Sequence, residues 1–519
     1  MKRFNTTGKC IADRHYMVRI DRQVNAAARL VEDNMYFCIN RGRQYGKTTT
    51  LAFLKEHLEE QGYAVFSISF EGMSDSAYDS LETLLYESVN LMTLPLRWIG
   101  IPNLVGDSSL QLVKTVDNCH GAISMVDFRN LVASLCSRNR AVLIIDEVDQ
   151  AGNYPTFIKF LGLLRSMYLS RDQMPTFQSV VLAGVYDIKN LKLKMRPDDQ
   201  HQYNSPWNIA APFDTDMSLH TDGIAEMLAE YKQDHQLDFE ESAIAQMIYD
   251  YTSGYPFLVS RLCQIIDENN LGWNKEGVLK ATQVILVERN TLFDDMVKKV
   301  DQFPQLRELL KDILFSGVNR TYSTDEKYIQ IANMFNFVRN VNGSVVINSR
   351  LMEIRLYNLF IGEEEGTTIY RNGLIDKNQF VRNGHLDMRH VLERFVIHFN
   401  EIYRPEKDDK FVEDNGRKIF LTYLRPIING VGNYYCEAQT RDLTRTDIIV
   451  DYLGQQYVVE LKIWRGNSYH EQGEQQLREY LDFYHLQTGY LVSFCFNKNK
   501  QVGVRDVVID CKTIVEAVV

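Results

Sequence analysis

The chain has 519 residues and a formal net charge of −11, with 45% hydrophobic and 24% charged residues. This length favours several domains, and the composition is typical of soluble globular proteins. The sequence contains no apolar run of the roughly 20 residues that a membrane span needs, and residues 1–7 lack the apolar core of a signal peptide. We therefore expect a cytoplasmic protein without a membrane partner.

The cysteines and the net charge exclude further classes of site and of binding surface. The eight cysteines are scattered singly, and no two form a CxxC pair. This argues against structural zinc and a disulfide framework, and it fits a reducing compartment. The acidic balance excludes a globally basic surface, so any surface that binds nucleic acid must be local.

A strand, a glycine-bearing loop and a helix are predicted in succession near the N-terminus. The apolar run 35–39 precedes the loop, and a helical pattern starts at Leu51. Between them, Gly46-Lys47-Thr48 matches the closing half of a phosphate-binding loop. Here Gly46 would let backbone N–H groups approach phosphate, Lys47 would reach the β- and γ-phosphates, and the Thr48 hydroxyl would hold Mg²⁺.

One position departs from this pattern. The first glycine of the motif is expected where Arg41 stands, and the glycine lies instead at Gly42. A chance Gly-Lys-Thr at a helix start is the alternative, and it loses ground only if a matching acidic strand follows. The residues predicted to contact the nucleotide in this stretch are Gly42, Gln44, Tyr45, Gly46, Lys47, Thr48 and Thr49.

A matching acidic strand is present downstream. Ala141–Ile145 is a continuous apolar run, typical of a buried parallel strand, and Asp146-Glu147 follows it directly. Asp146 is predicted to hold the nucleotide's Mg²⁺, directly or through water, together with Thr48, and Glu147 to polarise the attacking water. Either motif alone is weak evidence, and together in this order they predict ATP binding.

Two regions of the chain resemble parts of AAA-like ATPases of the signalling and replication-initiator type. Residues 4–8, 15–18 and 36–41 resemble the entry segment of one group, and Gly254-Tyr255-Pro256 resembles the Gly-x-Pro element of the helical lid. In the family, apolar residues of the entry segment pack beside the nucleotide's base, and the lid element couples the lid to the nucleotide. Plain core packing and a simple helix–helix turn would use the same residues.

The resemblance also implies a sensor and an arginine finger. The buried strand over 179–185 ends at Tyr186-Asp187, and either residue fits the polar sensor of the γ-phosphate. Arg196 is a candidate finger that would offset transition-state charge, and a solvated basic loop residue is the alternative. A finger acting on a neighbouring copy would require self-association, so a homo-oligomer is an expectation.

Residues 306–360 have a winged-helix pattern. Two helical pieces are followed by a strand pair with Asn342-Gly343 in its turn. The helix that would read DNA, around 326–334, contains one basic residue, Lys327. A packing or regulatory role is therefore favoured over base readout.

Two apolar strands near the C-terminus carry the second chemical pattern. Strands over 447–450 and 457–463 flank a turn, and a reversal about Gly454 would bring Asp447 opposite Leu461, beside Glu460 and Lys462. Glu460 and Lys462 project from one face of their strand because they are two residues apart. A divalent metal needs carboxylate oxygens, and a phosphate held on it needs a cation and an activated water.

Asp447…Glu460-x-Lys462 resembles the active site of the PD-(D/E)xK nuclease superfamily. Glu393 on a helix over 391–403, Glu437 on a strand over 434–438, and Gln476 in a Gln-x-x-x-Tyr helix agree with that family. The resemblance implies phosphodiester hydrolysis with Mg²⁺ or Mn²⁺. It makes Asp447 and Glu460 metal ligands, Lys462 the residue that positions or activates water, and Gln476 a further catalytic candidate. Surface hairpins also carry such acid–base pairs.

The predicted fold class is α/β, with a doubly wound P-loop core, a helical lid and a winged-helix region, followed by an α/β PD-(D/E)xK nuclease-like domain. The predicted boundaries are 1–215 for the ATPase core, 216–300 for the lid, 301–362 for the winged-helix-like region, 363–385 for a linker and 386–519 for the nuclease-like domain.

The predicted function is an ATP-hydrolysing protein coupled to a metal-dependent nuclease, with DNA favoured over RNA. Its role would lie in defence against foreign nucleic acid or in mobile-element biology. The alternative is a nucleotide-switched signalling or scaffold ATPase whose nuclease-like domain binds without cleaving. A translocating motor is weaker, because no helicase motif accompanies the two nucleotide-binding ones.

Overall fold

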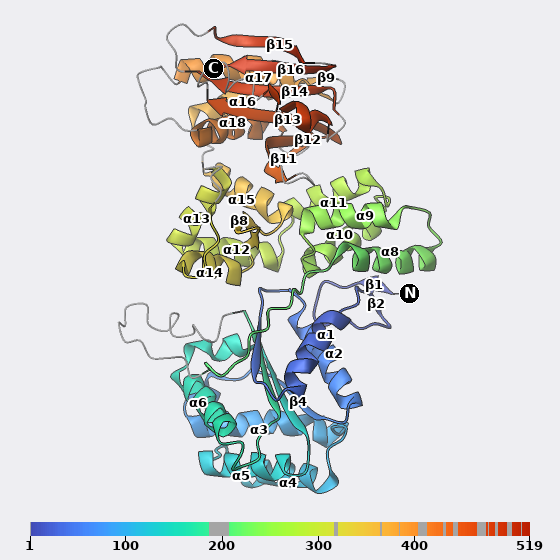
Figure 1. Cartoon of the computed structure of the whole chain (residues 1–519), viewed down its shortest axis with the longest axis vertical. Coiled ribbons are helices and arrows are strands. Elements are labelled where there is room, and N and C mark those ends of the chain that lie inside the picture. Colours follow the sequence, from blue (N-terminus) through green and yellow to red (C-terminus); the bar gives the residue numbers. More distant parts are fainter. Residues whose placement is uncertain are drawn as a thin grey trace. The chain divides into compact units, whose positions relative to one another are not determined.

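The structure is a computed structural model. It describes residues 2–185, 207–315, 320–363, 366–382, 385–402, 413–428, 432–439, 445–463, 474–475, 477–482, 486–495, 501–509 and 511–519. The chain forms two compact units, and Figure 1 labels many of their helices and strands. Unit 1 comprises Met1–Ala245, Gly254–Gln264 and Met334–Asn336, and unit 2 comprises Gln246–Ser253, Ile265–Asn333 and Phe337–Val519. The predicted lid region 216–300 thus contributes to both units.

Unit 1 is built on a four-stranded parallel sheet. Its strands are β3 (Phe37–Asn40), β4 (Ala64–Ser69), β5 (Ala141–Asp146) and β6 (Ser179–Gly184), in the order β3-β6-β5-β4. Every residue of β5 and β6 is buried, as expected for parallel strands covered on both faces. Since β6 lies between β3 and β5, the carboxyl ends of these three strands meet at one edge.

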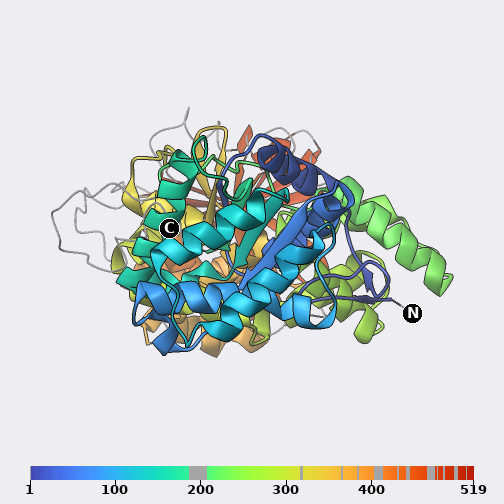
Figure 2. The same ribbon diagram turned by 90° about the horizontal axis from the view of Figure 1, so that it is seen from below.

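Helices cover the sheet of unit 1, as Figure 2 shows from below. The helices α1 (Asp21–Glu32) and α2 (Lys47–Glu60) pack against each other, and α3 (Leu81–Trp98) packs against α6 (Pro155–Leu169). A large core joins strand residues such as Phe66 to Phe157 of α6. The remaining elements of this region are β1 (Arg3–Phe4), β2 (His15–Tyr16), η1 (Asp75–Tyr78), α4 (Gly106–Asn118), α5 (Met125–Cys136) and η2 (Val148–Asn153).

The middle of the chain is mainly helical. Its elements are α8 (Thr221–His235), α9 (Glu241–Thr252), α10 (Pro256–Glu268), α11 (Lys275–Val287), α12 (Thr291–Gln302), α13 (Pro304–Phe315), α14 (Lys327–Met334), β7 (Val338–Val341), β8 (Ser344–Ile347) and α15 (Arg350–Gly362). The strands β7 and β8 are antiparallel. Asn342 and Gly343 join them with φ of 50° and 84°, which is the left-handed pair that a two-residue hairpin turn requires.

The sheet of unit 2 has six strands in the order β11-β12-β13-β14-β16-β15. The strands β13, β14 and β16 run parallel to one another, and the remaining pairs are antiparallel. The strands are β11 (Gly432–Gln439), β12 (Arg445–Tyr452), β13 (Gln455–Ile463), β14 (Thr488–Phe494), β15 (Gly503–Ile509) and β16 (Lys512–Val518). Short pieces η4 (Lys377–Gln379), β9 (Val381–Arg382) and β10 (His385–Leu386) precede this sheet.

One face of this sheet packs on the helices α17 (Met388–Ile402) and α18 (Glu413–Ile428). Phe494 of β14 contacts Phe399 of α17 with ring centroids 5.4 Å apart. A Cβ on Gly416 of α18 would lie 2.4 Å from the Phe494 ring, so this glycine permits the close approach. Because side chains alternate along a strand, Ser493 belongs to the opposite face.

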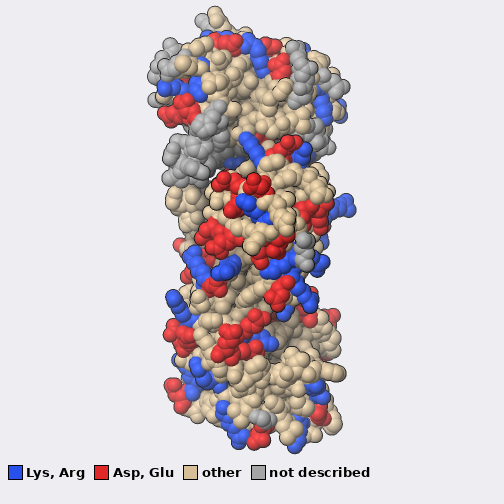
Figure 3. Space-filling view, turned by 90° about the vertical axis from the view of Figure 1, so that its right-hand side faces the viewer, with Lys and Arg blue, Asp and Glu red and all other residues tan. Residues whose placement is uncertain are grey.

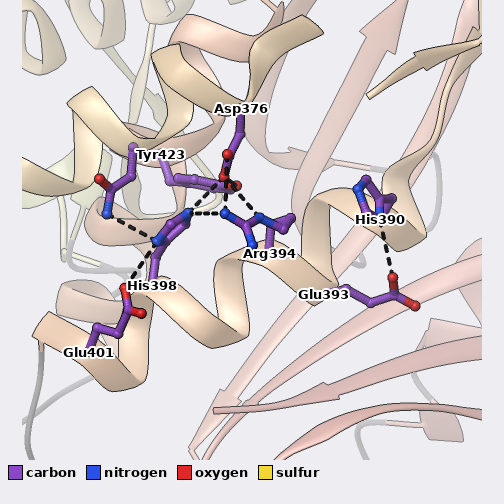
Figure 4. A network of polar contacts seen from close by, with 8 residues as sticks. Asp376, His390, Glu393, Arg394, His398, Glu401 and Tyr423 are labelled. Atoms are coloured by element: carbon purple, nitrogen blue, oxygen red, sulfur yellow. Dashed lines mark hydrogen bonds and ion pairs between the residues drawn. The ribbon is translucent and has the colours of Figure 1, made fainter. Parts of the chain in front are cut away.

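The segment 363–385, expected as a linker, contains the helix α16 (Thr368–Asp376), which packs on α17 and α18. Figure 4 shows the polar network that joins the three helices. The buried carboxylate of Asp376 lies 2.7 Å from His398 Nε2 and accepts a 3.1 Å hydrogen bond from the Tyr423 hydroxyl. The guanidinium of Arg394 donates two bonds of 3.3 Å to the same carboxylate.

Burial would raise the pKa of Asp376, but the hydrogen bonds from His398, Arg394 and Tyr423 outweigh it and hold the pKa below its ordinary value. A depressed pKa means that the folded state favours the ionised carboxylate. The stabilisation is therefore complete above the unfolded pKa of about 4 and is lost as the pH falls through the folded pKa.

None of the helices among the described residues is long and apolar enough to cross a membrane.

We expect Asp376→Asn to destabilise the α16–α18 layer by about 3 kcal/mol near neutral pH, because it leaves Arg394 without its buried anion. The difference from wild type should begin to shrink below about pH 4, the ordinary pKa of an aspartate, and should vanish as the pH falls through the depressed pKa of folded Asp376. Hydrogen exchange of the α16–α18 amides, corrected for intrinsic rates, measures both effects. Glu401→Gln removes the exposed acid of the same network and is the control. An equal effect of the two substitutions would contradict the assignment of Asp376 as the centre of the network.

Candidate functional site

The loop between β3 and α2 has the geometry of an anion-binding turn. Gln44 and Gly46 adopt left-handed backbone conformations, with φ of 54° and 81°, and Gly46 is the N-cap of α2. Lys47 is the first residue of that helix and is 6% exposed. Its ammonium donates to the carbonyls of Arg41 and Gly42, both at 3.1 Å. The cation is thus held across the loop, beside the first amides of a helix, where an anion is favoured.

The displaced glycine of the loop has a packing explanation. A Cβ on Gly42 would lie 2.6 Å from Asn336 Nδ2 and 3.4 Å from the Phe335 carbonyl oxygen, so a larger residue would force these groups apart. Arg41, at the position expected for glycine, donates to the carbonyls of Phe213 at 3.4 Å and Thr215 at 2.8 Å. Position 41 therefore anchors a neighbouring segment of unit 1.

The two motifs meet at the carboxyl edge of the sheet. The Thr48 hydroxyl donates a 2.8 Å hydrogen bond to Asp146 Oδ2. The other oxygen of Asp146 accepts a 2.9 Å bond from the backbone N–H of Glu147. Glu147 has a φ of 54°, which turns the chain sharply after β5.

Burial dominates the electrostatics of these groups. It lowers the pKa of Lys47, and the carboxylates of Glu147, Asp149 and Asp146 oppose that shift. Burial raises the pKa of Glu147, and Lys47 opposes that shift in turn. One ammonium and a group of carboxylates therefore share a poorly solvated site, and a hydroxyl and a carboxylate lie close enough to bind one divalent cation.

Asp149 is a site residue that the sequence did not single out. Its carboxylate accepts a hydrogen bond from the backbone N–H of Val185, just after β6. A Cβ on Gly184 would lie 2.9 Å from Asp149 Oδ1. The acid therefore ties the turn after β5 to the end of β6, and its only sequence signal is its place two residues after Glu147. The sensor and finger candidates Tyr186, Asp187 and Arg196 lie outside the described residues.

The Gly-x-Pro segment packs directly on the loop. The Tyr255 hydroxyl donates to the Arg43 carbonyl, and its ring meets Tyr45 edge-on with centroids 4.7 Å apart. Gly254 has a φ of 71°, and a Cβ there would lie 2.2 Å from the Leu219 carbonyl oxygen, so only glycine fits. Sequence reasoning identified the element, and the aromatic contact of Tyr255 appears only in the structure.

Thr49 connects the loop helix to the N-terminal segment. Its hydroxyl accepts a 3.1 Å hydrogen bond from the backbone N–H of Cys10. Thr49 and Tyr45, both predicted to contact the nucleotide, thus make contacts that fix the loop within unit 1.

In unit 2, Glu460 and Lys462 lie together as predicted. Lys462 Nζ is 2.9 Å from Glu460 Oε1, and the side chains are 16% and 1% exposed. The predicted register of their hairpin was wrong by one residue. Ile448 pairs with Val459, so continuing the register sets Asp447 opposite Glu460 and not Leu461.

The turn explains the difference in register. Tyr452 pairs with Gln455, and Leu453 and Gly454 form a two-residue turn with φ of 50° and 83°. Such a turn fixes the pairing of both strands, whereas a reversal about Gly454 implied a turn of three residues.

The other predicted residues of this site are only partly placed. The strands β12 and β11 contain Asp447 and Glu437, but the side chains of both, and the whole of Gln476, lie outside the described residues. Glu393 pairs with Arg389 and His390, each at 3.2 Å.

Comparison with known proteins identifies the N-terminal two thirds of the chain. The AAA-like domain family matches residues 8–353. A Walker-type ATPase of Pyrococcus abyssi is 14% identical with a TM-score of 0.48, covering 68% of this chain and 99% of that one. The ORC2 protein of Aeropyrum pernix is 12% identical with a TM-score of 0.34, covering 69% and 96%. The RuvB Holliday junction branch migration motor of Thermotoga maritima is 14% identical with a TM-score of 0.30, covering 63% and 90%. No curated protein matches the sequence significantly.

We expect Tyr255→Phe to weaken ATP binding about fivefold, because the loss of one hydrogen bond of roughly 1 kcal/mol frees the Arg43 carbonyl and the loop. Calorimetric titration with ATP measures the change. Tyr63→Phe is the control, since Tyr63 is also buried but precedes β4 at the opposite end of the strands. Unchanged affinity for ATP in Tyr255→Phe, or an equal loss in the control, would argue against a role of Tyr255 in holding the phosphate-binding loop.

Proposed function

The chain belongs to the family of proteins with an AAA-like domain, and from this premise we propose that unit 1 binds ATP with Mg²⁺ and hydrolyses it. The observation that carries the proposal is the contact between Thr48 and Asp146, 2.8 Å apart, beside the buried Lys47. A phosphate-binding loop and an acidic strand end are the two parts that such hydrolysis needs.

The residues present fit the nucleotide and its metal. The amides after Gly46 and the ammonium of Lys47 would hold the phosphates. Lys47 would exchange its contacts with the Arg41 and Gly42 carbonyls for phosphate oxygens. Thr48 and Asp146 supply a hydroxyl and a carboxylate oxygen, the ligands that Mg²⁺ prefers. The bound ion would offset the charge that develops on the phosphates.

Glu147 is the proposed residue that orients the attacking water. Its backbone turn after β5 places it next to Asp146, and burial raises the pKa of its carboxyl group. A carboxylate with a raised pKa is a better acceptor for the proton of a water. Asp149 would position the end of β6 beside it through Val185.

We further propose that unit 2 is a metal-dependent nuclease, acting on DNA in preference to RNA and regulated by the ATP site. The buried pair of Glu460 and Lys462 supports this proposal, as does the register that continues to Asp447 opposite Glu460. Asp447 and Glu460 would hold Mg²⁺ or Mn²⁺, and Lys462 would position the water that attacks the phosphodiester bond. Defence against foreign nucleic acid, or mobile-element biology, is the proposed setting.

We expect Glu147→Gln to bind ATP within about twofold of wild type and to hydrolyse it at least about 100-fold more slowly, because the amide cannot accept the proton. Phosphate release and nucleotide titration separate the two effects. Glu60→Gln, at the exposed end of α2, is the control and should match wild type. Full turnover in Glu147→Gln would exclude Glu147 from this role.

We expect Lys462→Ala to abolish cleavage of nucleic acid while ATP turnover continues. Linear, circular and single-stranded DNA and RNA are each incubated with Mg²⁺ or Mn²⁺, with and without ATP. Lys512→Ala removes another lysine of the same sheet, which pairs with Asp482, and is the control. If wild type turns over ATP but leaves every substrate intact, the alternative of a nucleotide-switched scaffold replaces the nuclease.

A further inference from the structure

A register row on one face of the unit 2 sheet crosses four neighbouring strands. Glu460 of β13 pairs with Leu491 of β14, and Leu491 pairs with Glu516 of β16. Glu516 in turn pairs with Arg505 of the edge strand β15. Residues paired in register share a face, so Glu460, Glu516 and Arg505 lie on one face of the sheet. This is the face opposite α17 and α18.

The carboxylate of Glu516 has no exposed surface, and both of its oxygens accept hydrogen bonds. The Ser493 hydroxyl donates to Oε1 at 3.2 Å, and Arg505 Nε donates to Oε2 at 2.5 Å. A fully buried carboxylate is costly unless it is paired. Here the pairing fixes the guanidinium of Arg505 at the sheet edge, and Ser493 fixes the carboxylate.

The side chain of Arg505 is 57% exposed although its partner is fully buried. Among the described residues, its terminal amino groups take part in no other hydrogen bond or ion pair. A guanidinium bound through Nε keeps the donors of its other edge for a ligand, and that fork matches two oxygens of a phosphate. Ser493, the residue that holds Glu516, is the register partner of Lys462.

The surface of the chain is not broadly basic, so a single fixed cation such as Arg505 indicates where a polyanion would bind. On the face drawn in Figure 3, the described basic and acidic residues are interspersed, and the net charge is −11. Affinity for a polyanion must then rest on individually placed cations and not on a broad basic field.

We propose that Arg505, positioned by Glu516 and Ser493, binds a backbone phosphate of the nucleic acid whose scissile phosphate lies at Glu460 and Lys462. The inference rests on the proposed nuclease function of unit 2. Three strand spacings of about 4.8 Å separate β13 from β15, which gives about 14 Å.

The test is equilibrium binding of a labelled DNA oligonucleotide to the full chain, with Ca²⁺ in place of Mg²⁺ to suppress cleavage. Fluorescence anisotropy over a series of salt concentrations gives the slope of log K against log salt. In Arg505→Gln we expect about tenfold weaker binding at low salt, and a slope smaller by about one because one phosphate contact is lost. Arg505→Lys keeps the charge and should retain the wild-type slope.

Arg389→Gln is the matched control. Arg389 pairs with Asp506, the next residue of β15 on the face toward α17, so it also loses an ion pair to this edge strand. If Arg505 had a purely structural role, Arg505→Gln and Arg389→Gln would change the DNA affinity and the salt slope equally. That result would overturn the proposal. A wild-type slope in Arg505→Gln would overturn it as well.

Cleavage with Mg²⁺, measured in parallel, separates this inference from the proposed function. Wild type that cleaves DNA, with unchanged binding in Arg505→Gln, refutes the Arg505 contact and leaves the nuclease standing. Wild type that binds through Arg505 without cleaving supports the contact and refutes the nuclease activity. Wild type that neither binds nor cleaves refutes both.

Discussion

The hydrogen bond between Thr48 and Asp146 joins residues 98 positions apart in the sequence, and the chemistry of unit 1 depends on it. It can form because β6 lies between β3 and β5. The phosphate-binding loop after β3 and Asp146 at the end of β5 are therefore separated by one strand. The hydroxyl and the carboxylate then meet across the end of β6. Lys47 directly precedes Thr48 and Glu147 directly follows Asp146 in the chain, so the same contact brings the cation and the acid to one place.

The sequence predicted much of this arrangement because its signals are local. Continuous apolar runs marked the buried strands of unit 1, and Gly46-Lys47-Thr48 marked the start of α2. The hairpin that carries Glu460 and Lys462 was also expected. Its register was missed because one residue of turn length changes the pairing, and the left-handed conformation of Leu453 cannot be anticipated from a leucine.

What the sequence left out depends on contacts between distant segments. Tyr255 is an ordinary core aromatic until Tyr45 and the Arg43 carbonyl are placed beside it. The helix α16 was expected as a linker because an acidic run precedes it, yet Asp376 at its end is the buried centre of a three-helix network. The displaced Gly42 looked like a defect in the motif, and Asn336, nearly 300 residues later, explains it.

The division of the chain into two units limits how the protein can be cut into domains or recombined with related proteins. Residues 246–253 and 265–333 belong to unit 2, whereas 254–264 and 334–336 belong to unit 1. The backbone therefore passes back and forth between the units, and no single cut yields two complete modules. Limited proteolysis or gene truncation at one point would leave at least one of the two units without some of its own segments. Exchange of the C-terminal unit between related genes would likewise have to carry interleaved segments from the middle of the chain.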